Sequence, residues 1–164
     1  MKAMKVVGAI IGCLILLLVV LRFTGFEPKD CPNGATLACR APGLWLRGEA
    51  VTTPVTDWSF TDNVQAIKIQ TQTPILLPYS VSAWCAVYNG NLYVTSNRGK
   101  RWVENIVRDP HVRVKIGDKV FDRDFVMVDD PAEKAAVLQA KGKKYPDWKV
   151  SPVSKSVVFR LTPG

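Results

Sequence analysis

The chain has 164 residues, 48% of them hydrophobic, and a formal net charge of +8 at pH 7. That length suits one modest globular domain with an additional segment. The one histidine has no partner acid recognisable in the sequence and no cysteine–histidine cluster is present, so neither a Ser-His-Asp arrangement nor a metal site is predicted. No basic repeat interleaved with aromatic residues is present, so nucleic acid is not an expected partner. The basic side chains form either a solvated surface or a contact for anionic lipid head groups or an acidic protein.

An uncharged apolar run at residues 6–21 follows two lysines and ends before Arg22. With its flanks, this run comes close to the roughly 20 residues that cross a bilayer. A cleaved signal peptide is the alternative, but it usually has a shorter apolar region and a small-x-small cleavage site, which does not follow this run. We therefore expect a transmembrane signal-anchor helix over residues 1–23, in contact with membrane lipid through residues 6–23.

The charges around this helix and the cysteines beyond it favour a domain outside the cytoplasm. Two lysines and the N-terminal amine precede the run, against Arg22 and Lys29 after it, which favours an N-terminus inside. Cys31 and Cys39 bracket a short loop with a turn-forming Asn-Gly pair; they are either a disulfide or unpaired thiols, and their spacing does not suit zinc. We predict the disulfide, and a single-pass protein of the inner (cytoplasmic) membrane with a periplasmic globular domain.

Residues 24–56 are rich in proline and glycine and predict a tether with little regular structure. Trp45 and Leu46 are its candidates for packing against the domain or the membrane surface. No internal repeat or low-complexity tract is present. The globular domain is expected over residues 57–164.

Strand signals dominate the first half of that domain. Residues 64–70 alternate enough for a strand. Residues 75–88 are a long apolar stretch interrupted by Pro78, which predicts two strand segments with an edge or a bulge at the proline. The Asn-Gly pair at residues 89–90 is a strong signal for a two-residue hairpin, leading into a strand at residues 91–96.

A short helix is predicted over residues 101–108. Trp102 and Ile106 are four apart on one face, and Val103 and Val107 lie on the next. The Asp-Pro pair that follows ends this helix and separates it from the next strand.

Two more alternating strands are predicted at residues 111–116 and 119–128, joined by a Gly-Asp turn. Asp122, Arg123 and Asp124 alternate along the second of them and are expected to form pairs across the strand. His111, with no partner acid recognisable in the sequence, is interpreted as a surface or strand residue rather than a general base.

A longer helix follows over residues 132–145. Its start is marked by Asp130 as the N-cap, Pro131 at the first helical position and Glu133 as a capping-box residue. Gly142 is expected to break it. A last strand is predicted at residues 156–161, and antiparallel strands with hairpin turns favour a small barrel over a parallel sheet.

The order of these motifs over residues 64–161 resembles the flavin-binding split-barrel superfamily, the pyridoxamine phosphate oxidase-like group. The branch it is most similar to is that of the deazaflavin-dependent nitroreductases. There, a strand ends in a small polar loop, a Trp-x-x-Asn pair opens a short helix, and Asn-Pro or Asp-Pro precedes a Val-x-Val strand. The corresponding elements here are residues 96–101, Trp102 with Asn105, Asp109 with Pro110, and Val112 with Val114.

This resemblance implies a mainly β, α+β fold: a six-stranded antiparallel split β-barrel with two short helices, usually a homodimer. It also implies that the phosphate of FMN or a deazaflavin is held near the loop and the short helix. Glycine allows close approach of an oxyanion to the backbone, helical amides point at it, and arginine and lysine add charge. The candidate cofactor-binding residues are Ser96, Asn97, Arg98, Gly99, Lys100, Arg101, Trp102 and Asn105.

Other interpretations of these residues stay open. The loop could be a charged turn or a protein or lipid contact, and Trp102 is more typical of a core anchor than of a ring-stacking residue. The glycine- and basic-rich segment that the branch carries before its central strands is absent, and residues 71–80 contain no lysine or arginine. Thr71, Thr73 and Tyr79 could hydrogen-bond a ring. Flavins are mainly cytosolic, so an exported domain could have kept the fold and lost the cofactor.

Two functions follow. The first is a membrane-anchored flavin- or deazaflavin-dependent oxidoreductase acting on quinone-like or nitro compounds. The second is a non-enzymatic accessory or scaffolding subunit of a larger membrane protein complex. The cofactor carries the chemistry in the first case, so no catalytic side chain and no metal ligand is predicted.

Overall fold

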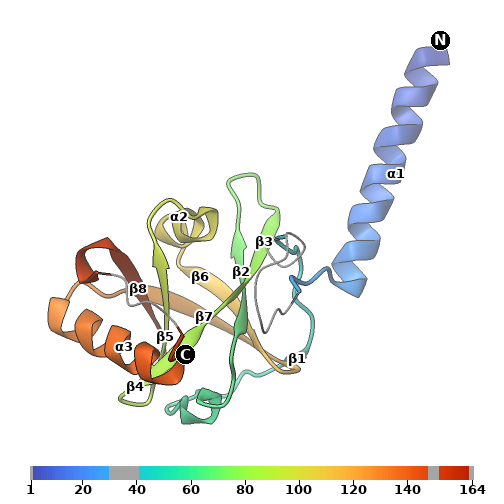
Figure 1. Cartoon of the computed structure of the whole chain (residues 1–164). Coiled ribbons are helices and arrows are strands. Elements are labelled where there is room, and N and C mark those ends of the chain that lie inside the picture. The colour runs from blue at the N-terminus through green and yellow to red at the C-terminus, as the bar shows by residue number, and fades with distance from the viewer. Residues whose placement is uncertain (1, 30–40, 148–151, 163–164) are drawn as a thin grey trace.

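The computed structural model describes residues 2–29, 41–147 and 152–162. The predicted Cys31–Cys39 disulfide lies outside the described residues. The described chain folds into a long N-terminal helix and a curled sheet flanked by two helices (Figure 1). The elements in chain order are α1 (Lys2–Thr24), β1 (Glu49–Ala50), η2 (Ser59–Thr61), β2 (Ile67–Gln72), β3 (Pro78–Ala83), β4 (Cys85–Tyr88), β5 (Asn91–Asn97), α2 (Arg101–Arg108), β6 (His111–Ile116), β7 (Lys119–Met127), α3 (Pro131–Lys144), η3 (Val153–Lys155) and β8 (Ser156–Leu161).

The sheet has the strand order β3-β2-β6-β7-β8-β5-β4, with antiparallel neighbours throughout, and β1 adds a short parallel pair to β7. β3 and β4 stand at opposite ends of this order, yet only Trp84 separates them in the chain. The two ends of the sheet therefore meet, which curls it into a half-barrel. The expected count of six strands is wrong, because the described part of the chain has seven strands in this order besides β1.

The interruption of the apolar stretch at residues 75–88 falls at Trp84 and not at Pro78. Pro78 begins β3, which ends the strand order, and a residue without an N–H is tolerated on such an edge. The predicted turn at residues 89–90 is confirmed: Asn89 and Gly90 have φ values of 48° and 74°, which a type I′ hairpin requires at both positions.

The barrel interior is filled by the alternating inward side chains of the strands. In β2, every second residue is buried, and the same alternation in β6 brings Val112 and Val114 inside. Burying one large aliphatic or aromatic side chain contributes about 1.5–3 kcal/mol to the stability of the fold. Trp102, Val103 and Ile106 of α2 join this core, whereas Val107 is 62% exposed, so α2 covers the barrel with a single apolar face.

The longer helix α3 starts as predicted, but the predicted break within it is wrong. The Asp130 carboxylate accepts hydrogen bonds from the N–H groups of Ala132 and Glu133, at 3.1 and 3.0 Å. Glu133 instead accepts from the Tyr93 hydroxyl at 2.8 Å. Gly142 does not break the helix, which runs to Lys144. Glycine in a helix costs only about 1 kcal/mol relative to alanine, and the packing of α3 on β4 outweighs that.

The segment expected to be a tether pairs with the sheet. The Gly43 and Ser80 backbones exchange hydrogen bonds of 2.8 and 3.0 Å, and Val51 N–H donates to the Val120 carbonyl at 2.8 Å. Of the two residues of this segment that were expected to pack against the domain or the membrane surface, Leu46 is buried and Trp45 is half-buried. This part of the chain is therefore a strap along the barrel.

Helix α1 extends away from the barrel (Figure 1). Its residues 4–24 are long and apolar enough to cross a membrane, and their side chains make no buried contact with the domain. By length and composition alone, a signal sequence would pass the same test.

Candidate functional site

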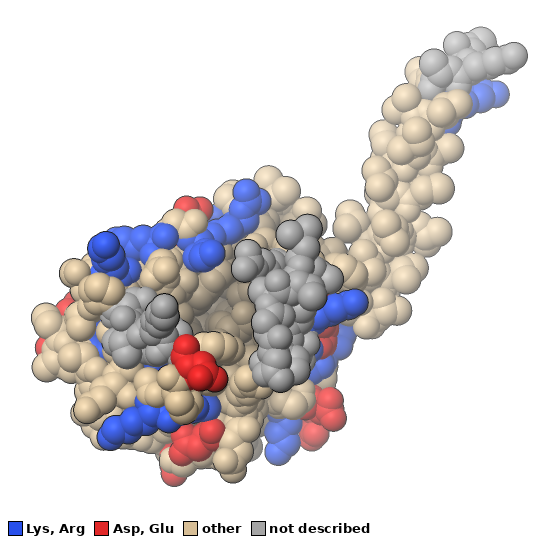
Figure 2. All heavy atoms as spheres, viewed as in Figure 1, with Lys and Arg blue, Asp and Glu red and all other residues tan. Residues whose placement is uncertain are grey.

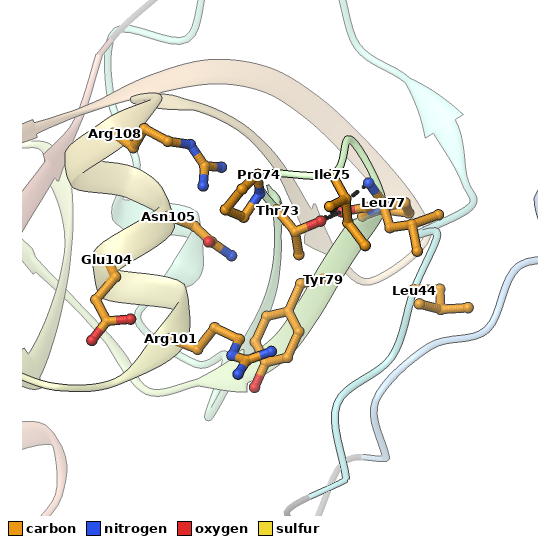
Figure 3. Close-up of a pocket in the computed structure, with 11 residues that line it drawn as sticks. Leu44, Thr73, Pro74, Ile75, Leu77, Tyr79, Arg101, Glu104, Asn105 and Arg108 are labelled. Atoms are coloured by element: carbon orange, nitrogen blue, oxygen red, sulfur yellow. Dashed lines mark hydrogen bonds between the residues drawn. The ribbon is translucent and has the colours of Figure 1, made fainter.

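A pocket of about 600 Å³ lies between α2 and the β2–β3 hairpin. One wall is the polar face of the helix, and the other is the hairpin with its apolar side chains (Figure 3). Leu44 of the strap lines its far end. The lining residues are Leu44, Thr73, Pro74, Ile75, Leu77, Pro78, Tyr79, Arg101, Glu104, Asn105 and Arg108.

The helical wall follows from the spacing of its residues. Arg101, Glu104, Asn105 and Arg108 are spaced i, i+3, i+4 and i+7, so they share one side of α2. The apolar side of the helix is buried in the core, which turns this polar side toward the hairpin. Figure 3 shows the Asn105 side chain directed at the hairpin and the Arg101 guanidinium beside the Tyr79 ring.

The hairpin wall is held by its own turn. Thr73 N–H and Thr73 Oγ1 both donate to the Leu77 carbonyl, at 2.9 and 2.7 Å, and Leu77 N–H donates to Thr73 Oγ1 at 3.1 Å. Leu76 has a φ of 62°, a left-handed conformation that is unfavourable for a leucine. The turn thereby presents Ile75 and Leu77 beside the pocket.

Buried hydrogen bonds join the two walls. Asn105 Nδ2 donates to Thr71 Oγ1 at 3.0 Å, and Thr71 Oγ1 donates to the Tyr79 carbonyl at 3.1 Å. Asn105 and Thr71 are 3% and 2% exposed. The Arg108 guanidinium also donates to the carbonyl of Gln72 at the end of β2. These bonds set the distance between helix and hairpin, and so the width of the pocket.

The structure separates the predicted cofactor-binding residues into four groups. Arg101 and Asn105 line the pocket. Trp102 is a core residue, 8% exposed, with its ring centroid 6.1 Å from that of Phe159. Ser96 is half-buried at the end of β5. The remaining four are exposed at the end of β5 and in the turn before α2, and they line no part of this pocket: Asn97, Arg98, Gly99 and Lys100.

Glycine is needed in that turn for its conformation. Gly99 has a φ of 83°, and a Cβ added to it would meet no atom within 4 Å. Its role in the described structure is therefore the left-handed turn that leads β5 into α2. Positive charge is nonetheless concentrated here, because Arg98, Lys100 and Arg101 are all exposed around it.

Sequence reasoning missed most of the pocket. Arg108 and Glu104 could have been found, since they stand at helical spacing from Arg101 and Asn105. Of the hairpin, Thr73 and Tyr79 were recognised as possible ring contacts, and both do line the pocket. Nothing in the sequence indicated Leu44, because its place depends on how the strap folds back on the barrel.

A second pocket, of about 440 Å³, includes His111, Arg113, Asp122 and residues of β2 in its lining. His111 does have a partner acid: Asp124 is its register partner on β7, with Nδ1 and Oδ1 3.1 Å apart. The expectation of an unpartnered histidine is wrong because strand pairing, invisible in the sequence, brings the acid close. Both groups are exposed, so the interpretation of a surface residue holds.

Two further charges of this second pocket are paired with each other. Arg113 donates from Nε and a terminal nitrogen to the two Asp122 oxygens, both at 2.8 Å. These bonds lower the pKa of Asp122 and raise that of Arg113. Arg123 points to the other side of the strand, is 8% exposed and donates to the Thr53 carbonyl at 2.9 Å.

The α2 pocket can therefore bind a flat or elongated apolar molecule that carries an anionic group. Its hairpin wall offers apolar surface, and Arg101 offers a guanidinium whose planar donors match phosphate or carboxylate. Among the residues that the structure describes, no group of three His, Cys, Asp or Glu side chains could hold a metal ion.

Comparison with known proteins locates the fold. No family model matches the sequence, and no curated protein matches it. Among solved structures, the conserved hypothetical protein Rv2991 from Mycobacterium tuberculosis has a TM-score of 0.55 at 18% identity, over 70% of this chain and 85% of that one. A putative pyridoxamine 5'-phosphate oxidase from Listeria innocua has a TM-score of 0.53 at 18% identity, over 64% and 88%. A protein described as an F420 reductase has a TM-score of 0.50 at 18% identity, over 68% and 96%.

These likenesses confirm the resemblance at the level of fold. The described barrel has the split-barrel fold that these solved structures share. At 18% identity they show the fold alone, so cofactor and activity have to be argued from the pocket.

Proposed function

We propose that this protein is a membrane-anchored split-barrel oxidoreductase that binds a flavin or deazaflavin in the α2 pocket and acts on quinone-like or nitro compounds. The observation that carries the proposal is the pocket itself, in which the cationic face of a helix lies opposite an apolar hairpin. The fold it shares with a protein described as an F420 reductase supports the same choice of cofactor.

The residues present fit such a group. Arg101 would hold its phosphate, with Arg98 and Lys100 adding positive charge near the mouth. The apolar ring system would lie against Pro74 and Tyr79. When bound, the cofactor supplies hydride transfer, and the protein supplies position and electrostatics. The Asn105–Thr71 bond would orient the ring indirectly, by fixing the pocket width, and the hairpin would exclude water from one side.

Anchoring by α1 and a periplasmic domain complete the proposal. The apolar helix of residues 4–24 supports the anchor, and the excess of positive charge before it favours an N-terminus inside. The predicted Cys31–Cys39 disulfide belongs to the same proposal, since it needs an oxidising compartment. Labelling of the two thiols before and after reduction, in intact cells and in lysed cells, tests the compartment and the disulfide together.

The experiment for the cofactor is an absorbance spectrum of the full-length protein, purified from its membrane in mild detergent. Three variants locate the site: Arg101→Gln in the pocket, Arg98→Gln with Lys100→Gln in the exposed turn, and Lys143→Gln on α3 as a control. Loss of a stoichiometric flavin band in the first alone would support the pocket, and loss in the second alone would support the turn.

A colourless wild-type protein that co-purifies with other membrane proteins would contradict the enzyme. It would support the second function, an accessory or scaffolding subunit of a membrane complex. The molecular mass of the same preparation tests the predicted homodimer.

A further inference from the structure

The chain between α1 and the barrel leaves little freedom between them. Glu27 lies three residues after Thr24, the last residue of α1. Three residues of fully extended chain span at most about 10 Å. Its carboxylate accepts hydrogen bonds from Lys115 Nζ at 2.6 Å, Lys68 Nζ at 3.0 Å and the Arg47 N–H at 3.1 Å. We refer to Glu27, Lys68 and Lys115 as the Glu27 clamp. It ties the end of α1 to β2 and β6.

Several further contacts strengthen the clamp. Burial would raise the pKa of Glu27, but the hydrogen bonds from Lys115, Arg47 and Lys68 outweigh it and lower that pKa, so the carboxylate stays charged. Phe26 N–H donates to the Trp45 carbonyl at 3.1 Å. A Cβ on Gly43 would stand 2.4 Å from the Phe26 carbonyl, so only glycine allows the two segments to pack this closely. A bilayer that holds α1 must therefore lie directly against the barrel.

On the side of the barrel that faces such a bilayer, the tip of the β2–β3 hairpin is apolar. The β2–β3 hairpin points to the same side of the molecule as that to which α1 rises (Figure 1). Its turn exposes two large aliphatic side chains, Ile75 and Leu76, each 75% exposed. Leu76 adopts a left-handed φ of 62°, where glycine or asparagine would be less strained. Such a residue at an exposed turn is poorly explained by the stability of the barrel.

Basic side chains lie beside this tip, on the side of α2. The exposed cations of α2 and of the turn before it are Arg98, Lys100, Arg101 and Arg108. Figure 2 shows lysine and arginine side chains gathered along the upper edge of the barrel, on the side of the hairpin and of α1. An apolar tip within a cationic border suits the surface of an anionic bilayer, where apolar groups enter the acyl region and cations meet head groups.

We infer that the tip of the β2–β3 hairpin, residues 74–77, inserts into the bilayer that holds α1, and that the α2 pocket thereby opens at the membrane surface. Ile75 and Leu77 belong to the tip and to the pocket lining alike, so a molecule dissolved in the bilayer can enter between hairpin and helix without crossing water. The substrate class is an amphiphile that is soluble in the bilayer. This inference rests on the anchoring in the proposed function.

The test uses the full-length protein in nanodiscs of phosphatidylcholine and phosphatidylglycerol, with and without bromine on the acyl chains. Tryptophan is introduced at the tip by Ile75→Trp and, separately, Leu76→Trp, and the emission of the wild-type protein is subtracted. Phe60→Trp is the matched control, since Phe60 is 53% exposed on η2, at the end of the barrel away from the hairpin tip. Leu16→Trp in α1 reports on anchoring.

In both tip variants, as in Leu16→Trp, we expect the added emission to shift to the blue and to lose most of its intensity with brominated lipid. In Phe60→Trp, we expect the emission to keep its intensity. Unquenched tip variants beside a quenched Leu16→Trp would overturn the inference and leave the anchor intact. An unquenched Leu16→Trp would overturn the anchoring itself. Tip emission that shifts to the blue without quenching would assign the tip to a protein surface, and would also overturn the inference.

Discussion

The two cavities beside the β2–β3 hairpin differ in how their charges are used. In the second pocket, Arg113 is bound to Asp122 through two hydrogen bonds, and His111 lies against Asp124. In the α2 pocket, Arg101 faces the apolar hairpin surface, Arg108 donates to the Gln72 carbonyl, and Glu104 is the acid in the lining. A guanidinium already paired with a carboxylate has few free hydrogen-bond donors and little uncompensated charge with which to bind an anion. The comparison therefore favours the α2 pocket over the second as the proposed ligand site.

The largest effect is expected from the buried bond that joins the walls of the α2 pocket. Asn105→Ala leaves the Thr71 hydroxyl with one partner fewer in a buried site, which should lower the free energy of unfolding by about 1–3 kcal/mol. Urea unfolding of the full-length protein in detergent measures it. Glu104→Ala, at an exposed position of the same helix, should change the free energy of unfolding by no more than about 0.5 kcal/mol. Equal losses in both variants would mean that the walls are not held together by this bond.

The next effect concerns binding. Arg101→Gln removes charge-assisted hydrogen bonds to a phosphate, each worth about 1.5–3 kcal/mol, and should weaken FMN binding by roughly tenfold or more. Calorimetric titration of the full-length protein with FMN measures the change. Arg113→Gln, in the second pocket, should leave the affinity unchanged. If Arg113→Gln weakened binding as much as Arg101→Gln, the assignment of the two pockets would be wrong.

In the hairpin between the pockets, the exposed Leu76 should lower the stability of the fold while adding contact with the membrane. Leu76→Gly relieves a left-handed conformation that costs a leucine about 1–2 kcal/mol, part of which is offset by the greater freedom of glycine in the unfolded chain. We expect a gain of about 0.5–1 kcal/mol in the free energy of unfolding. Asn89→Gly should gain less, because asparagine tolerates its φ of 48°.

The same Leu76→Gly variant should also show weaker quenching of a tryptophan at position 75 by brominated lipid. A gain in stability without any loss of lipid contact would indicate that Leu76 does not enter the bilayer. A loss of stability would contradict the strain at this turn.

The fold was largely predictable because its signals are local. The Asn-Gly turn, the Asp130 cap and the alternation in β6 and β7 each depend on residues close in the chain, and each was confirmed. The pocket was less predictable because it joins α2 to a hairpin some 30 residues earlier. Arg101 and Asn105 were found by motif; Asn105 meets Thr71 only after the barrel has closed. The turn at Gly99, the most conspicuous feature of the sequence, lies outside the pocket lining.

The smallest effect is expected from the second pocket. Asp122→Asn removes an exposed ion pair, so it should lower the free energy of unfolding at neutral pH by about 0.2–1 kcal/mol. The hydrogen bonds from Arg113 hold the pKa of Asp122 below its ordinary value. The stabilisation is therefore present above that ordinary value, near 3.9, and is lost as the pH falls through the lower value of the folded protein. The stability curves of wild type and variant should begin to approach each other below about pH 4, and should meet once the pH is below the pKa of Asp122 in the folded protein. A change in FMN affinity in Asp122→Asn would show that charges in the second pocket reach the first, and the division between a structural and a binding cavity would fail.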